Sequence, residues 1–132
     1  MATVQFESRP WGEFSTYEDH PSDTFWVKKL TLKPGGSLSL QKHDHRKEFW
    51  VCVQGEIIVR VNGEQQTLHA GDFVCIERLQ SHIAQNPSKK DDAVLIETAT
   101  GVCLETDNKR IEDQYGRADN NNGMYTMSNK HT

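Results

Sequence analysis

The chain of 132 residues has room for one domain with one hydrophobic core. Only 35% of the residues are hydrophobic and 26% are charged, so the chain has few core-forming side chains for its length. The net charge of −4 argues against nucleic-acid binding through overall positive charge, and no apolar run is long enough to form a membrane span.

Between Phe25 and Leu104, short apolar runs alternate with turn residues, a pattern typical of an all-β sandwich or barrel. No long run of residues has the period of a helix. The expected strands are residues 25–32, 37–43, 49–53, 56–61, 66–68, 73–76, 82–85, 93–98 and 102–104. The sequence therefore predicts a single all-β domain.

The dipeptide Asn62-Gly63 is the strongest turn signal in the chain. Both residues tolerate the positive φ of a type I′ turn, which predicts a hairpin in which residues 57, 59 and 61 pair back against residues 66–68. Beyond the last strand the composition becomes polar, and residues 118–132 are rich in asparagine. We expect a domain over residues 1–117, with its core at about 25–104, and a polar, disordered tail over 118–132.

The three cysteines, Cys52, Cys75 and Cys103, are an odd number, and each lies in an apolar run. Their spacing is not that of a metal site, so they are predicted to be reduced core residues. The N-terminus lacks the pattern of a secretory signal peptide. We therefore expect a cytoplasmic protein with no nucleic-acid or membrane partner.

Residues 37–43 alternate between apolar and polar side chains. Leu38 and Leu40 share one face of the expected strand, whereas Ser39, Gln41 and His43 share the other. One interpretation is an ordinary strand whose polar face meets solvent. The other is a strand whose polar face lines the inside of a small barrel.

Three further residues favour the second interpretation. His45 lies two residues after His43 and is expected on the same face. Glu48 opens the next apolar strand, and His82 begins a strand farther along the chain. Imidazole, carboxylate and amide oxygen are suitable ligands for a divalent first-row metal. The sequence therefore indicates a metal site inside the barrel, with Ser39, Gln41, His43, His45 and Glu48 facing inward and Leu38 and Leu40 facing away.

The spacing of these residues resembles the two motifs of the cupin superfamily. The first motif is matched by Gly35, Gln41, His43, Glu48 and Gly55, with Gln41 at a position where many cupins have histidine, and the second by Gly71, His82 and Asn86. The proline and second glycine usual in the second motif are replaced here by Glu77 and Leu79.

Within the cupins, the chain resembles the C-terminal domain of type II phosphomannose isomerases, which longer relatives join to a mannose-1-phosphate guanylyltransferase. The similarity lies in residues 9–12 (RPWG), 28–34 (KKLTLKP), 37–50 (SLSLQKHDHRKEFW) and 110–117 (RIEDQYGR). It implies a double-stranded β-helix of the jelly-roll kind.

The resemblance also implies a metal set of Gln41, His43, Glu48 and His82, with zinc as the usual ion. His45 is an alternative to Gln41, either as a ligand or as an orienting or acid-base group beside the metal. The implied reaction interconverts mannose 6-phosphate and fructose 6-phosphate through an enediol. We expect a homodimer, since cupin-like barrels commonly pair.

Cationic side chains are needed to hold the substrate phosphate. Arg117 is the first candidate, at the mouth of the pocket, and three weaker candidates are Lys28, Lys109 and Arg110. The base that moves the proton stays open between His45 and Glu105.

Two other functions use the same residues. A cupin without catalytic activity would bind a sugar or another metabolite through the same ligands. A mononuclear iron oxygenase would use His43, Glu48 and His82 as a face of two histidines and one carboxylate.

Overall fold

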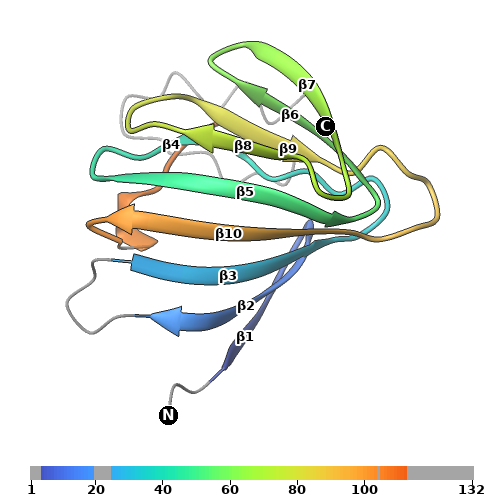
Figure 1. Cartoon of the computed structure of the whole chain (residues 1–132), viewed down its shortest axis with the longest axis horizontal. Helices are drawn as coiled ribbons and strands as arrows, with labels where there is room; N and C mark the ends of the chain where they lie inside the picture. Colours follow the sequence, from blue (N-terminus) through green and yellow to red (C-terminus); the bar gives the residue numbers. More distant parts are fainter. Residues whose placement is uncertain (1–3, 20–24, 104, 113–132) are drawn as a thin grey trace.

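Two antiparallel sheets make up the part of the chain that the computed structural model describes, which is residues 4–19, 25–103 and 105–112 (Figure 1). In this part of the chain the one helical element is a short 3-10 turn, η1 (Glu105–Asp107). The all-β prediction is therefore confirmed. No helix among these residues is long and apolar enough to cross a membrane.

The first sheet has six strands, with a long central strand hydrogen-bonded on both sides. The strands are β1 (Gln5–Arg9), β2 (Gly12–Asp19), β3 (Phe25–Leu32), β5 (Arg46–Gln54), β8 (Phe73–Ile76) and β10 (Ala93–Gly101). Their order across the sheet is β1-β2-β3-β10-β5-β8, and Figure 1 shows β10 between β3 and β5. Burial alternates strictly along β3, because successive side chains point to opposite faces of a sheet.

The second sheet has five strands. They are β4 (Leu40–Lys42), β6 (Glu56–Val61), β7 (Glu64–His69), β9 (His82–Gln85) and β11 (Lys109–Glu112). Their order is β11-β4-β9-β6-β7. Segments from both ends of the chain therefore extend the sheets, β1 in the first and β11 in the second.

The hairpin predicted at Asn62-Gly63 is confirmed. Asn62 has a φ of 50° and Gly63 a φ of 84°, the positive values that a type I′ turn requires at both positions. The predicted pairing is confirmed for Ile57, which lies opposite Leu68, and for Val59, opposite Gln66, but Val61 lies opposite Glu64 and so outside the predicted segment 66–68. A two-residue turn fixes this register locally.

Three strands were not predicted, namely β1, β2 and β11. Their sequences are largely polar, and they form strands because each pairs with a neighbouring strand, β1 with β2, β2 with β3, and β11 with β4. The strand predicted at 102–104 is wrong for Val102 and Cys103. β10 ends at Gly101, whose φ of 110° turns the chain back toward β5, and the Val102 N–H donates to the His45 carbonyl.

The main core lies between the two sheets. Its fully buried side chains include Leu32, Trp50, Ile57, Leu68 and Leu95. Two aromatic residues from the N-terminal segment, Trp11 and Phe14, join the same cluster. Strand β2 and the turn before it are therefore part of the packed domain.

The burial of the cysteines corrects one prediction. Cys52 and Cys103 are buried, as expected, but Cys75 is exposed. On β8 the buried positions are Val74 and Ile76, so the alternation of the strand turns Cys75 outward. An apolar run on an outer strand does not bury all its members.

Candidate metal centre and its cavity

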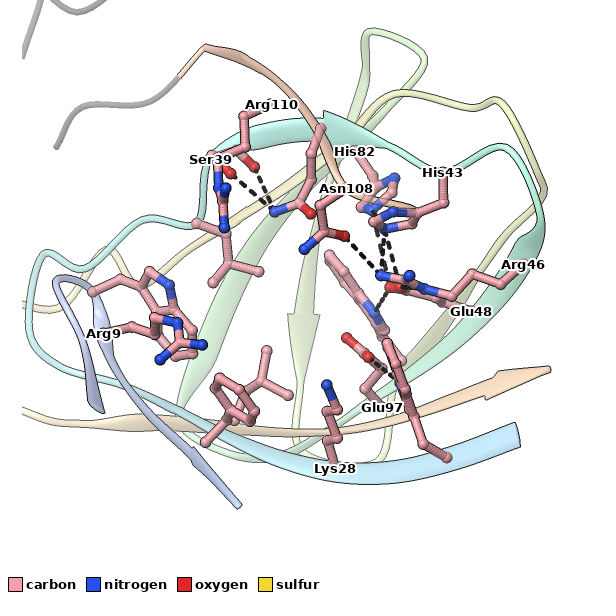
Figure 2. Close-up of a pocket in the computed structure, with 17 residues that line it drawn as sticks. Arg9, Lys28, Ser39, His43, Arg46, Glu48, His82, Glu97, Asn108 and Arg110 are labelled. Carbon is pink, nitrogen blue, oxygen red and sulfur yellow. Dashed lines mark hydrogen bonds and ion pairs between the residues drawn. The ribbon is translucent and has the colours of Figure 1, made fainter. Parts of the chain in front are cut away.

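A cavity inside the barrel has walls contributed by both sheets (Figure 2). Its apolar wall is formed by Trp11, Phe14, Trp26, Leu30, Leu38 and Trp50. All three tryptophans are buried, so they are core residues that also face the cavity. The remaining wall is polar and charged.

Three neighbouring strands of the first sheet bring polar groups to the floor of this cavity. Glu97 on β10 lies opposite Lys28 on β3 and opposite Trp50 on β5. Two residues farther along β10, Ala99 is aligned in the same way with Trp26 and Glu48. Positions two apart on a strand share one face, so these residues point to the same side.

The metal-type cluster consists of His43, Glu48 and His82, all almost fully buried. His43 follows β4, Glu48 lies in β5, and His82 begins β9. The His43 and His82 Nε2 atoms are 3.0 Å apart, and His43 Nε2 is 3.1 Å from Glu48 Oε2. His82 Nε2 lies 3.9 Å from Glu48 Oε1.

Backbone carbonyls orient both imidazoles. His43 Nδ1 lies 3.1 Å from the Asp107 carbonyl oxygen, and His82 Nδ1 lies 2.9 Å from the Gln80 carbonyl oxygen. Assigning the ring proton to Nδ1 satisfies both carbonyls and turns an Nε2 lone pair toward Glu48. Burial lowers the pKa of His82 to about 4, so this imidazole is neutral near pH 7, the form that binds metals.

The Glu48 carboxylate receives hydrogen bonds on both oxygens. Trp50 Nε1 donates to Oε1 at 2.8 Å, and Arg46 Nε donates to Oε2 at 2.9 Å. Burial alone would raise the pKa of Glu48, but the positive charge of Arg46, which also donates a hydrogen bond to the carboxylate, opposes this, and the pKa of Glu48 lies well below its ordinary value. Glu48 is therefore a carboxylate, not a carboxylic acid.

The donor set fits a divalent metal. Metal bonds of about 2.0–2.2 Å place adjacent ligand atoms of a tetrahedral or octahedral site about 3.0–3.5 Å apart. Two of the three separations in the cluster fall in this range. With both Nδ1 atoms protonated, two nitrogen lone pairs face each other at 3.0 Å, an approach that a bound cation would stabilise.

The guanidinium group of Arg46 contacts this cluster. Its Nη2 atom lies 3.2 Å from His43 Nε2 and donates to the Asn108 side-chain oxygen at 2.9 Å. The guanidinium also packs over the Trp26 ring, 4.5 Å from its centroid. Arg46 therefore orients Glu48 and fixes one side of the cluster.

Gln41, the fourth predicted ligand, lines the same cavity. Its backbone lies opposite His82 in the pairing of β4 with β9, and its amide nitrogen donates to Ser39 Oγ at 2.9 Å. Leu38 lines the cavity as well, although it was expected to face away from the metal site. The regular strand begins only at Leu40, so the alternation of faces does not extend back to Leu38.

His45 lies apart from the cavity. Its side chain is exposed and belongs to a second cluster, with Asp44 and Asp107. The Asp107 carboxylate accepts the backbone N–H groups of Asp44 and His45, which stabilises the turn between β4 and β5. The turn reverses the chain after His43. His43 and His45 are therefore not in one continuous strand, and their two-residue spacing does not place them on the same face.

The predicted phosphate-binding residues are separated by the fold. Lys28 and Arg110 line the cavity. Lys109 is exposed and forms an ion pair with Asp44 outside it. Arg117 and the side chain of Glu105 lie outside the described residues.

Four polar residues of the cavity were missing from the sequence-based site, namely Arg9, Arg46, Glu97 and Asn108. For Glu97 a signal was available, because it is the one charged residue in the apolar run of β10. The even spacing from Leu95 also places it on the inward face. A charge at an inward position of a central strand is a recognisable sign of a site.

Comparison with known proteins gives consistent matches. The family model described as "Mannose-6-phosphate isomerase C-terminal" matches residues 2–113. Mannose-1-phosphate guanylyltransferase ManC of Salmonella typhimurium is 40% identical over 110 residues, which cover 83% of this chain and 22% of that protein. Xanthan biosynthesis protein XanB of Xanthomonas campestris is 39% identical over 83% of this chain and 23% of its own length. The chain thus spans less than a quarter of these relatives.

Solved structures agree on the fold. An RmlC-like cupin from Shewanella frigidimarina has a TM-score of 0.66 at 22% identity, covering 78% of this chain and 87% of that chain. A cupin-2 domain from Rhodospirillum rubrum has a TM-score of 0.64 at 14% identity, covering 79% and 78%. The two sheets therefore form a cupin double-stranded β-helix.

Proposed function

The chain belongs to the mannose-6-phosphate isomerase C-terminal family, and we propose that it is a metal-dependent isomerase that interconverts mannose 6-phosphate and fructose 6-phosphate. The observation that carries the proposal is the buried cluster of His43, Glu48 and His82 in a cavity that also contains cationic side chains. An aldose–ketose isomerase needs both features, one for the reacting oxygens and one for the phosphate.

The metal ligands would be His43, Glu48 and His82, with Gln41 as the fourth, and zinc is the proposed ion. When bound, the metal supplies positive charge that stabilises the oxygen anion developing on the sugar. The protein residues orient this site. Arg46 and Trp50 hold the two oxygens of Glu48, and the carbonyls of Gln80 and Asp107 hold the two imidazoles.

The phosphate would bind on the other side of the cavity. Figure 2 shows Arg9 and Arg110 in the part of the cavity away from His43 and Glu48. Arg9 also pairs with Glu7 at 3.0 Å and packs 4.8 Å from the centroid of the Phe14 ring. Guanidinium groups match the planar, two-point hydrogen bonding of phosphate oxygens. The proposed substrate thus extends from the metal centre to these arginines, and Arg117 remains a further candidate.

Replacing Arg110 by alanine is expected to raise KM for mannose 6-phosphate by about 10- to 100-fold, because a hydrogen bond to a charged group contributes about 1.5–3 kcal/mol. The effect should be on KM more than on kcat, since the phosphate is remote from the reacting carbons. Arg78→Ala is the matched control, because Arg78 is exposed and does not line the cavity. Equal KM values for Arg110→Ala and the unmodified chain would contradict this role.

The proposed activity is tested with the purified chain loaded with Zn²⁺. Incubation with mannose 6-phosphate is expected to yield fructose 6-phosphate, measured by 31P NMR or a coupled assay, and removal of the metal with a chelator should stop the reaction. Stoichiometric metal without turnover of any hexose phosphate would contradict the proposal and support a sugar-binding cupin. Oxygen consumption with Fe²⁺ would support an oxygenase instead.

A further inference from the structure

Glu97 is a buried carboxylate at the floor of the cavity. It lies in the middle of β10, and its side chain points into the cavity beside Lys28 (Figure 2). The Trp26 indole Nε1 donates to Glu97 Oε2 at 2.7 Å. The sequence and register place Glu97 on the same inward face as Glu48 and Trp50, one strand away.

Burying the charged side chains of Glu97 and Lys28 is energetically unfavourable if they serve only to stabilise the fold. Lys28 is also buried, with its Nζ atom 3.6 Å from the centroid of the Trp26 ring and 4.7 Å from that of Phe14. Removing two charged groups from water is unfavourable, and apolar side chains of the same volume are often equally stable in such places. A buried carboxylate and ammonium that both line a cavity therefore point to chemistry.

The protonation behaviour of Glu97 fits such a role. Burial raises its pKa to about 7, and the negative charge of Glu48 adds to the effect, against the opposing charges of Lys28 and Arg46 and the hydrogen bond from Trp26. A proton-transfer group is most effective when its pKa lies close to the working pH. Glu48, by contrast, is held ionised with both oxygens engaged.

We infer that Glu97 is the catalytic residue that carries the proton between C2 and C1 of the bound sugar phosphate, a role that rests on the proposed isomerase function. Its carboxylate removes the C2 proton, the C–H electron pair forms the C1–C2 double bond, and O1 takes the carbonyl electron pair. The O2 proton passes to O1, C2 becomes the carbonyl carbon, and C1 takes the proton back from Glu97. No oxidant or co-reactant is needed, since the atoms of substrate and product are the same.

Lys28 has a separate part in this arrangement. Lys28 lies opposite Glu97 in the β3–β10 pairing, and its ammonium packs over the Trp26 and Phe14 rings. There it offsets the negative charge of the ionised carboxylate. His45, one of the two base candidates from the sequence, is exposed and does not line the cavity.

The test compares Glu97→Gln with the unmodified chain, both loaded with Zn²⁺. Glutamine keeps the shape of the side chain and can accept the Trp26 hydrogen bond, but it cannot take the proton. We expect kcat to fall by about 100-fold or more, whereas metal content and the Kd for mannose 6-phosphate, measured by calorimetry, stay within about threefold. The control Glu64→Gln makes the same change at an exposed position and should leave all three values unchanged.

The outcomes separate this inference from the proposed function. Turnover by Glu97→Gln within about tenfold of the unmodified chain would overturn the role of Glu97 and leave the isomerase function intact. If the unmodified chain has no turnover, the proposed function itself fails. If Glu97→Gln does not fold, Glu97→Asp provides the test. Its shorter carboxylate should lower kcat by at least about tenfold and leave the substrate Kd unchanged. An unchanged kcat would overturn the inference.

Discussion

Replacing His82 by alanine is expected to weaken metal binding by more than about 100-fold and to abolish isomerase activity. Changes to groups that merely orient metal ligands already cost about 10- to 100-fold in affinity, so losing a ligand should cost more. His82 is also a buried residue in contact with His43 and packed edge-on against Trp50. The measurement is metal content after dialysis against a weak chelator, together with the isomerase assay.

The matched control for this variant is His69→Ala. His69 is exposed on β7, where it contacts Glu56 at 3.3 Å, and it does not line the cavity. This variant should keep both the metal and the activity. Circular dichroism establishes that each variant is folded, and His43→Ala provides a second test of the same cluster. Stoichiometric metal in folded His82→Ala would rule out His82 as a ligand.

The largest expected effect on stability comes from Ile57→Ala. Ile57 is fully buried in the main core on β6, and truncation of a buried isoleucine costs about 2–5 kcal/mol through lost burial and the cavity left behind. Domains of this size have a total free energy of unfolding of about 5–15 kcal/mol, so the loss is a large fraction of it. Urea unfolding at equilibrium measures the difference.

The next residue provides the control. Ile58 lies on the opposite face of the same strand and is only partly buried. Its replacement by alanine removes the same atoms and should cost about 1 kcal/mol or less. A shift of the hairpin register by one residue would exchange the two faces. Equal costs for the two variants, or a larger cost for Ile58→Ala, would contradict the register that places Ile57 opposite Leu68.

Much of the barrel could be predicted because its strands are specified locally. The bounds of β3, β6, β8 and β9 agree with the predicted ones, since apolar runs and turn residues mark them directly. The Asn62-Gly63 turn fixes its hairpin within a few residues. Strands β1, β2 and β11 were missed because their side chains are mostly polar, and only β11 has a partner distant in the sequence. β1 pairs with β2, and β11 with β4.

The candidate site was predictable where ligand chemistry has a characteristic spacing. His43, Glu48 and His82 were selected by residue type and interval, and the structure brings their donor atoms together. The sequence spacing of His45 did not predict its location, because the turn stabilised by Asp107 directs its side chain outward. Sequence spacing could not identify Glu97 either, because Glu97 is not part of either motif. It reaches the cavity through the pairing of β10 with β3 and β5.

The sequence by itself determined the strand pattern, the tight hairpin and the types of ligand, because these depend on neighbouring residues and on the two-residue period of a strand. Only the tertiary structure decided which polar groups share the cavity. Lys28, Trp50 and Glu97 become neighbours through strand pairings that join distant parts of the chain. Such pairings depend on the packing of the whole barrel, and this long-range packing gives Glu97 its buried position beside the metal-type cluster.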